Sequence, residues 1–196
     1  MNITVAILAG GRSRRMGADK AEMMWNGLSL LERMTREAQK ANLPVLIIGH
    51  EKPADWPVPE TMFAADDWPG RGPLGGLLTA LRHAEGSSIL LTACDMPALS
   101  AEALSWLARQ APQTHGAAIV NAAQLEPLFS LYAPACRDAA GPQMRAGRLS
   151  LHGLIEGGQF QKIEAPAWLR PQLVNINTPE EWAQWTANAE EAQPHP

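Results

Sequence analysis

The sequence predicts an α/β fold: a single domain of three layers, α/β/α, around a mainly parallel, Rossmann-like sheet. Two observations predict it. Short, almost fully apolar segments alternate along the chain with amphipathic segments of helical period. Segments that are apolar throughout are typical of parallel strands, because helices cover both of their faces. We expect this domain at 1–187, followed by a disordered tail at 188–196, which lacks an apolar face.

Strands are expected wherever a short apolar, β-branched run ends in glycine, proline or a polar turn. The first run is followed by a loop rich in glycine and arginine. A short extended segment at 21–25 is closed by the turn pair Asn26-Gly27. In order along the chain, the expected strands are 3–8, 45–49, 61–65, 88–92, 116–120, 128–131, 160–163 and 173–176.

Helices are expected where apolar residues recur at helical spacing behind a capping residue. Serine and threonine are good caps, and proline suits a first turn. In order along the chain, the expected helices are 30–41 after a capping box of Ser29 and Glu32, 73–84 with Pro73 in its first turn, a helix capped by Ser100, a mixed helical stretch at 135–154 interrupted by Gly141-Pro142 and Gly147, and a last helix that follows Asn177 or Thr178 and runs to Trp185.

Composition excludes several classes of protein. The net charge of −4 and the pI of about 5.7 argue against a broad basic surface for nucleic acid. No apolar run approaches the roughly 18 residues of a membrane span, and the first apolar run lacks the features of a signal peptide. The two cysteines, Cys94 and Cys136, exclude a disulfide scaffold and a four-cysteine zinc site. They fit a reducing, cytoplasmic setting.

Three unusual loops, at 9–20, 66–76 and 93–97, each follow an expected strand. Ligands of α/β sheets bind beyond the carboxyl ends of the strands, so we expect these loops at one edge. The first loop contains adjacent glycines, Gly10 and Gly11, followed by three arginines and a lysine. Such glycines let backbone N–H groups approach a phosphate, and clustered cations favour an anion. The alternative is a solvated basic turn.

The spacing of this loop excludes two common phosphate-binding loops. A dinucleotide-binding loop needs Gly-x-Gly-x-x-Gly, and a Walker loop needs lysine directly after glycine. Residues 8–20 instead read Leu-Ala-Gly-Gly-x-x-x-Arg-Met-Gly-x-x-Lys. This pattern is similar to the signature of the nucleotidyltransferases that activate sugars, isoprenoid precursors and the molybdenum cofactor.

Three further motifs narrow the resemblance: Gly-Pro-Leu-Gly-Gly at 72–76, Cys-Asp-Met-Pro at 94–97 and Asn-Ile-Asn-Thr-Pro-Glu-Glu at 175–181. In this order the chain resembles the molybdenum cofactor guanylyltransferase (MobA-type) family over nearly its whole length. The resemblance implies a nucleotide-diphospho-sugar transferase type of fold. It implies an enzyme that moves GMP from GTP to molybdopterin, with or without molybdenum, and releases pyrophosphate. It also implies Mg²⁺ as cofactor, with other molybdenum cofactor biosynthesis proteins and molybdoenzyme chaperones as partners.

The resemblance assigns roles to the motif residues. Arg15, Lys20 and Asp95 form the candidate catalytic set, in which the two cations stabilise charge on the triphosphate. Asp95 follows a buried strand, where its carboxylate can hold Mg²⁺ against phosphate oxygens. The nucleotide-binding candidates are Leu8, Ala9, Gly10, Gly11, Arg12, Lys20, Gly49, Asp66, Gly75 and Asp95.

Several of these positions keep alternatives. Asp66 fits the family's spacing for an aspartate that contacts the nucleotide, but Asp67 is adjacent and the choice stays open. Guanine-using relatives often carry an asparagine at the end of the second strand, and the matching segment of this chain is Ile48-Gly49-His50. His50 either replaces the contact of that asparagine with the base or is solvated. Asn175 and Asn177 would share one face of a strand, on the side of the molybdopterin acceptor. Their alternative roles are a turn and a helix cap.

Three other functions stay open. The same transfer can use CTP, although cytidylyltransferase relatives usually depart from the Gly-Pro-Leu and Asn-x-Asn-Thr-Pro forms. A non-catalytic carrier of cofactor or nucleotide would be free to lose Lys20 and Asp95. A sugar-1-phosphate nucleotidyltransferase usually carries more residues for a sugar pocket than the compact C-terminal half of this chain contains. In the expected reaction the attacking phosphate is already ionised near neutral pH, so no dedicated general base is required.

Overall fold

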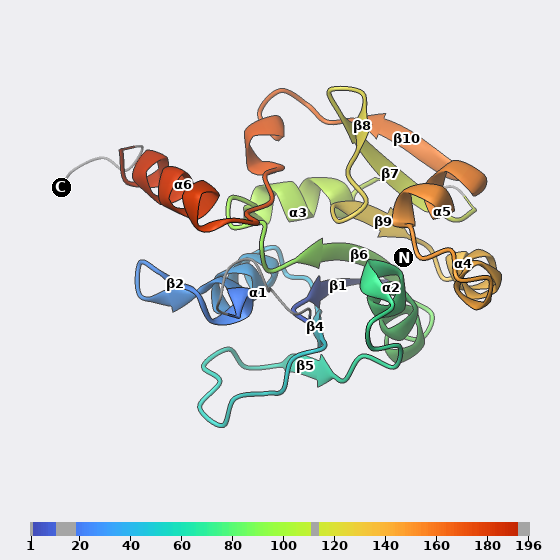
Figure 1. The fold of residues 1–196 in the computed structure, drawn as a ribbon, viewed down its shortest axis with the longest axis horizontal. Helices are drawn as coiled ribbons and strands as arrows, with labels where there is room; N and C mark the ends of the chain where they lie inside the picture. The colour runs from blue at the N-terminus through green and yellow to red at the C-terminus, as the bar shows by residue number, and fades with distance from the viewer. Residues whose placement is uncertain (1, 11–18, 111–113, 192–196) are drawn as a thin grey trace.

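The structure, a computed structural model, describes residues 2–10, 19–110 and 114–191 (Figure 1). Within them, one sheet contains the strands β1 (Ile3–Leu8), β4 (Val45–Ile48), β5 (Thr61–Ala64), β6 (Ser88–Ala93), β7 (Gly116–Asn121), β8 (Gln124–Leu125), β9 (Ser130–Tyr132) and β10 (Phe160–Glu164). A small second sheet pairs β2 (Met24–Trp25) with β3 (Leu28–Ser29). The helices are α1 (Leu30–Lys40), α2 (Gly72–His83), α3 (Ala101–Ala108), α4 (Cys136–Arg145), α5 (Leu151–Gly157) and α6 (Pro179–Glu191), with short 3-10 turns η1 (Lys20–Glu22) and η2 (Arg170–Gln172).

The first half of the chain builds a parallel array. β1 pairs with β4 and β6, and β4 pairs with β5, all in parallel. Leu8, the last residue of β1, pairs with Ile48 of β4 and with Ala93 of β6, so these strands end level with one another. The loops that follow β1, β4, β5 and β6 therefore emerge at one edge of the sheet, which confirms the expectation from the sequence.

The second half of the chain makes the sheet mixed. The strand order is β10-β7-β9-β6-β1-β4-β5, with β8 paired to β7. β9 runs antiparallel to both β6 and β7, whereas β10 is parallel to β7. The predicted strand at 128–131 begins later, because the Phe129 N–H turns back to the Glu126 carbonyl at 2.9 Å. The α/β architecture with a mainly parallel sheet is confirmed.

The sheet lies between two layers of helices (Figure 1), and a hydrophobic cluster packs between the sheet and each layer. Val5 and Ile7 of β1 belong to the cluster shared with α1 and α3, whereas Ala6 belongs to the cluster shared with α2, α4 and α5. This division follows from the two-residue period of a strand. All three side chains are fully buried, as expected for a strand with helices on both faces.

Local signals located several boundaries correctly. The Ser29 hydroxyl accepts the Glu32 N–H at 3.1 Å and caps α1, and the Ser100 hydroxyl accepts the Ala103 N–H at 3.3 Å and caps α3. The pair Asn26-Gly27 forms the predicted tight turn between β2 and β3 with φ angles of 49° and 78°.

Three predictions about the C-terminal third were wrong. Residues 173–176 are not a strand, because they lie over the loop after β6, where the Ile176 N–H donates to the Asp95 carbonyl at 2.9 Å. Helix α4 runs through Gly141-Pro142, so no interruption occurs there, whereas the predicted interruption at Gly147 is confirmed, because Gly147, at φ 72°, follows the end of α4. Helix α6 continues past Trp185, so the described part of the predicted tail, 188–191, is helical. Residues 192–196 lie outside the described residues.

A tight turn between β7 and β8 is strained by its sequence. Ala122 and Ala123 have φ angles of 49° and 68°, a left-handed backbone that costs a residue with a Cβ roughly 1 kcal/mol. The pair Asn26-Gly27 occupies the equivalent turn between β2 and β3 without this cost. We therefore expect Ala122→Asn with Ala123→Gly to raise the free energy of unfolding by about 1 kcal/mol. Urea denaturation measures this.

A matched control separates turn geometry from a general effect of glycine. Ala187 is exposed within α6, where Ala187→Gly should lower the free energy of unfolding by about 1 kcal/mol. A turn variant that is no more stable than the wild type would contradict the strain.

Candidate active site

Two glycines bring the ends of β1 and β4 together. A Cβ added to Gly10 would lie 3.1 Å from the Gly49 carbonyl oxygen, and one added to Gly49, at φ 81°, would lie 3.0 Å from the Gly10 Cα. The Ala9 N–H donates to the Ile48 carbonyl at 3.0 Å. Four predicted nucleotide-binding residues therefore lie together at the carboxyl edge of the sheet: Leu8, Ala9, Gly10 and Gly49.

The glycines at the start of α2 permit close packing. A Cβ on Gly76 would lie 2.6 Å from Leu8 Cδ2, and a Cβ on Gly75 would lie 2.9 Å from the Trp68 carbonyl oxygen. Helix α2 can therefore pack directly against the end of β1 and against the loop that precedes α2. The structure gives Gly75 this packing requirement, and its nucleotide-binding role stays a prediction.

A lysine, an aspartate and an asparagine from distant parts of the chain meet at this edge. The Lys20 Nζ donates to Asp95 Oδ2 at 2.9 Å and to Asn177 Oδ1 at 2.8 Å. The side chains of Lys20 and Asp95 are only 14% and 18% exposed, so solvent screens their ion pair incompletely. Asp19 fixes the turn beneath Lys20, because its Oδ1 accepts the Ala21 N–H at 2.9 Å.

Asp95 keeps an unused oxygen. Its Oδ2 is bonded to Lys20, whereas its Oδ1 is buried and has no hydrogen-bond partner in the described part of the chain. Burying a carboxylate oxygen without a donor is costly unless a cation meets it. Asp95 therefore fits the role of a ligand for a divalent metal ion, with phosphate oxygens as further ligands.

Tryptophans hold the C-terminal segment in place. Trp185 of α6 packs on Trp25 of β2 with ring centroids 4.7 Å apart, and Trp182 stacks on Trp185 at 5.5 Å. The Arg33 guanidinium lies 4.5 Å from the centre of the Trp25 ring and donates to the Pro97 carbonyl at 2.9 Å. Because α6 is anchored in this way, the segment before it can deliver Asn177 to Lys20. This tryptophan cluster was not predicted from the sequence, since its members are far apart in the chain.

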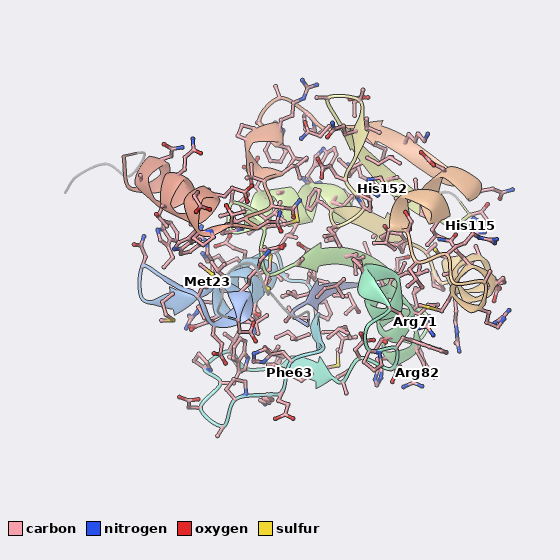
Figure 2. The ribbon with its side chains drawn as sticks, viewed as in Figure 1. Met23, Phe63, Arg71, Arg82, His115 and His152 are labelled. Carbon is pink, nitrogen blue, oxygen red and sulfur yellow. The ribbon has the colours of Figure 1, made fainter. Side chains whose placement is uncertain are left out.

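The structure separates the adjacent aspartates. Asp67 pairs with Arg82 of α2, which directs its carboxylate toward that helix. Figure 2 labels Arg82. The Asp66 carboxylate accepts the Trp68 N–H at 2.9 Å. Asp66 also lies beside the glycine pair of β1 and β4, because a Cβ on Gly49 would lie 3.9 Å from its Cβ. This geometry favours Asp66 as the aspartate nearer the nucleotide.

His50 is not a solvated loop histidine. Its side chain is only 14% exposed, and its Nε2 lies 3.9 Å from Asp19 Oδ2. Its Nδ1 lies 2.7 Å from the Glu51 carbonyl oxygen. Ligand atoms of Asp19, Glu22 and His50 lie within 4.8 Å of one another, a grouping that sequence analysis did not foresee. A contact of His50 with a nucleobase stays a prediction.

The two cysteines are free and buried. Burial and, second, the neighbouring Asp95 raise the pKa of the Cys94 thiol to about 12. Burial raises the pKa of Cys136 to about 12 as well. Both thiols are protonated near neutral pH, so Cys94 packs beside the site and does not act as a nucleophile.

A cavity of about 700 Å³ lies beside Asn175, one of the two predicted acceptor residues. It is bordered by the β7–β8 hairpin, the loop at 125–128, the start of α5 and Asn175. The Asn175 Oδ1 is buried and has no partner among the described residues, whereas Asn177 faces Lys20. Because this segment is not a strand, the predicted shared face of the two asparagines does not apply. The helix cap is Thr178, whose hydroxyl accepts the Glu181 N–H at 3.2 Å.

Glu126 at the wall of this cavity was missed from the sequence. It is half-buried, and burial raises the pKa of its carboxyl group, with smaller opposing effects from Asn121 and His152. His152 lies on α5 (Figure 2). The only signal in the sequence was an acidic residue flanked by apolar ones, in Leu-Glu-Pro-Leu.

The predicted site residues Gly11, Arg12 and Arg15 lie outside the described residues.

Comparison with known proteins identifies the family. The profile of the MobA-like NTP transferase domain matches residues 5–157. The chain belongs to the MobA-like NTP transferase family. A molybdenum cofactor guanylyltransferase of Xanthomonas euvesicatoria is 34% identical over 92% of both chains. A probable molybdenum cofactor guanylyltransferase of Synechococcus elongatus is 35% identical over 93% of this chain and 97% of its own.

Solved structures agree with the family. Molybdopterin-guanine dinucleotide biosynthesis protein A of Archaeoglobus fulgidus superposes with a TM-score of 0.72 at 26% identity, over 96% of this chain and 99% of its own. A 2-C-methyl-D-erythritol 4-phosphate cytidylyltransferase of Thermus thermophilus shares the fold at 18% identity, with a TM-score of 0.69 over 97% of this chain and 100% of its own. Nucleotidyltransferases of this family generally use a divalent metal ion. Among the described residues, no helix has the length and apolar character needed to cross a membrane.

Proposed function

We propose that the protein moves GMP from GTP to molybdopterin, with or without bound molybdenum, and releases pyrophosphate, as a step of molybdenum cofactor biosynthesis. The observation that carries the proposal is the meeting of Lys20, Asp95 and Asn177 at the carboxyl edge of the sheet. It occurs in a chain whose relatives are named molybdenum cofactor guanylyltransferases. The enzyme class follows from the family.

The transfer is a substitution at the α-phosphorus of GTP. A terminal phosphate oxygen of the acceptor attacks that phosphorus, the bond to the oxygen that bridges to the β-phosphate breaks, and its electron pair leaves with pyrophosphate. The attacking phosphate is ionised near neutral pH, so the chain needs no general base. This agrees with a Cys94 thiol that stays protonated, because its pKa is about 12.

The chain supplies position and countercharge. Lys20, held by Asp95 and Asn177, presents a fixed ammonium group to the negative charge of the transferring and leaving phosphates. Asp95 would hold Mg²⁺, which supplies further positive charge against phosphate oxygens. Arg15 is the third proposed catalytic residue, and Gly11 and Arg12 are proposed to surround the triphosphate. These three assignments rest on the motif alone.

The acceptor is proposed to bind on the side of Asn175 and Asn177. Two observations support this placement: Asn175 borders the cavity, and its buried Oδ1 lacks a partner among the described residues. Other molybdenum cofactor biosynthesis proteins and molybdoenzyme chaperones stay predicted partners. A cytoplasmic location stays a prediction that the two free cysteines support.

Nucleotide choice tests the proposal directly. Purified protein is incubated with Mg²⁺, molybdopterin and either GTP or CTP labelled at the α-phosphate. We expect labelled GMP in the product and release of an equal amount of pyrophosphate. Incorporation of CMP alone would support a cytidylyltransferase. Nucleotide binding without pyrophosphate release would support a carrier.

The two adjacent aspartates give a sharper test of the nucleotide site. Asp66→Asn is expected to lower kcat/KM for GTP by about 10- to 100-fold, because a hydrogen bond to a charged group is worth about 1.5–3 kcal/mol. Asp67→Asn is the matched control, since Asp67 pairs with a half-exposed arginine of α2. It should change kcat/KM by less than about twofold. A larger loss in Asp67→Asn than in Asp66→Asn would reverse the assignment.

A further inference from the structure

We propose that Glu126 determines specificity for the acceptor: its carboxylate accepts hydrogen bonds from the 2-amino group and the adjacent ring N–H of a pterin bound in the 700 Å³ cavity. This inference rests on the proposed function, because it takes the acceptor to be molybdopterin. Glu126 is then a specificity residue that lies away from the reacting phosphates.

The backbone holds Glu126 firmly at the cavity wall. Its N–H donates to the Ile119 carbonyl at 2.8 Å, and its carbonyl accepts the Phe129 N–H at 2.9 Å and the Ser130 hydroxyl at 2.8 Å. Pro127 follows directly and restricts the backbone further. A side chain on a backbone fixed in this way can recognise a ligand with little loss of entropy on binding.

The carboxylate of Glu126 has unused capacity for hydrogen bonds. Its Oε1 accepts from Asn121 Nδ2 at 3.3 Å, and among the described residues no donor reaches its Oε2. No described lysine, arginine or histidine lies within ion-pair distance of Glu126. Burial raises the pKa of its carboxyl group, because the charged form is disfavoured away from water. Donors from a ligand would offset that cost.

A second acceptor lines the same cavity. The Asn175 Oδ1 is buried and lacks a partner among the described residues. Leu125, Leu128 and Leu173 supply apolar wall. Two acceptors beside apolar walls fit a flat heterocycle that carries N–H donors on its edges. A pterin has this character, because its 2-amino group and neighbouring ring N–H form a paired donor edge.

Guanine presents the same pair of N–H donors, so the base of GTP is the alternative ligand for this cavity. The pterin is favoured because the described cavity lining comes from the β7–β8 hairpin, the start of α5 and the segment at 173–175, with Pro73 of α2. None of these residues belongs to the Gly10–Gly49 junction at the ends of β1 and β4. The guanine base is expected at that junction.

Steady-state kinetics of Glu126→Gln and Glu126→Ala, with Mg²⁺, GTP and molybdopterin, test the inference. We expect the KM for molybdopterin to rise by about 10- to 100-fold in both variants, with kcat and the KM for GTP changed less than about twofold. Glu126→Gln keeps the size of the side chain but replaces an acceptor with a donor, so it separates recognition from packing. Glu156→Gln, at an exposed position of α5, is the matched control and should behave as wild type.

A direct binding measurement is independent of turnover. The anisotropy of free pterin, followed by its own fluorescence, should show binding to the wild type and about tenfold weaker binding to Glu126→Gln. A rise in the KM for GTP alone would overturn the inference and place guanine in the cavity. Unchanged kinetics and pterin binding in both variants would also overturn it. A wild type that binds pterin but transfers no GMP would contradict the proposed function instead.

Discussion

Replacing Lys20 with alanine is expected to lower the rate of GMP transfer by about 10²–10³-fold, the typical cost of losing one group that stabilises transition-state charge. Its Nζ lies 2.9 Å from Asp95 Oδ2 and 2.8 Å from Asn177 Oδ1. The ammonium group is therefore already in place when the phosphates arrive, and alanine removes both the charge and its fixed position. The rate of incorporation of α-labelled GMP at saturating GTP and Mg²⁺ measures the effect.

Two further variants make this result specific. Lys40→Ala removes the same charge from the exposed end of α1, where Lys40 pairs with Glu37 at 2.7 Å, and should leave the rate unchanged. Lys20→Met keeps the length of the side chain and should be as slow as Lys20→Ala if the charge matters. Wild-type transfer by Lys20→Met would show that Lys20 has no part in the chemistry.

The second large effect is expected from Asp95→Asn. This isosteric change should lower the rate of pyrophosphate release by at least about 10²-fold and raise the Mg²⁺ concentration needed for half-maximal rate. The reason is the buried Asp95 Oδ1, which has no partner in the described structure and fits a metal ligand. Asparagine keeps the shape of the side chain but offers the metal a neutral oxygen. A titration with Mg²⁺ at saturating substrates measures both changes.

The controls for Asp95 address fold and coupling. Asp138→Asn, at an exposed position in the first turn of α4, should leave the Mg²⁺ requirement unchanged. Thermal melting checks that Asp95→Asn is folded. Because Lys20 and Asp95 are bonded to each other, the losses in the double variant should be less than additive. An Asp95→Asn protein with a normal rate and Mg²⁺ requirement would favour the carrier hypothesis.

The parts of the fold that sequence predicted well are those with local causes. The first strand is apolar on both faces, and Ser29 caps α1 through a contact three residues away, so both signals lie within a few residues. Residues 173–176 carry a similar apolar signal but form no strand. A strand needs a partner with a free edge, and that depends on where the rest of the chain lies. Gly141-Pro142 predicted a break in the helix, but α4 continues through it. Packing of α4 on α2 outweighs the local cost of proline within a helix.

The site residues also divide into those that could be predicted from the local sequence and those that could not. Its motif residues Gly10, Asp66 and Asp95 could be placed at one edge, because each follows a strand of a parallel array. The partner of Asn177 could not be foreseen, since Lys20 lies 157 residues away along the chain. The proposed role of Glu126 could not be predicted from the sequence either. Its position becomes notable only when the hairpin, α5 and the segment at 173–175 enclose a space around it.

The contact between Lys20 and Asn177 also bears on how this family can diverge. The family match ends at residue 157, yet Asn177, which contacts the proposed catalytic Lys20, lies beyond that limit. We therefore propose that residues 165–191 form a C-terminal module that contributes to catalysis through Asn177. A chimera that takes residues 165–191 from a relative would import acceptor-side groups together with a support for Lys20. Selectivity and turnover should consequently change together when this module is exchanged.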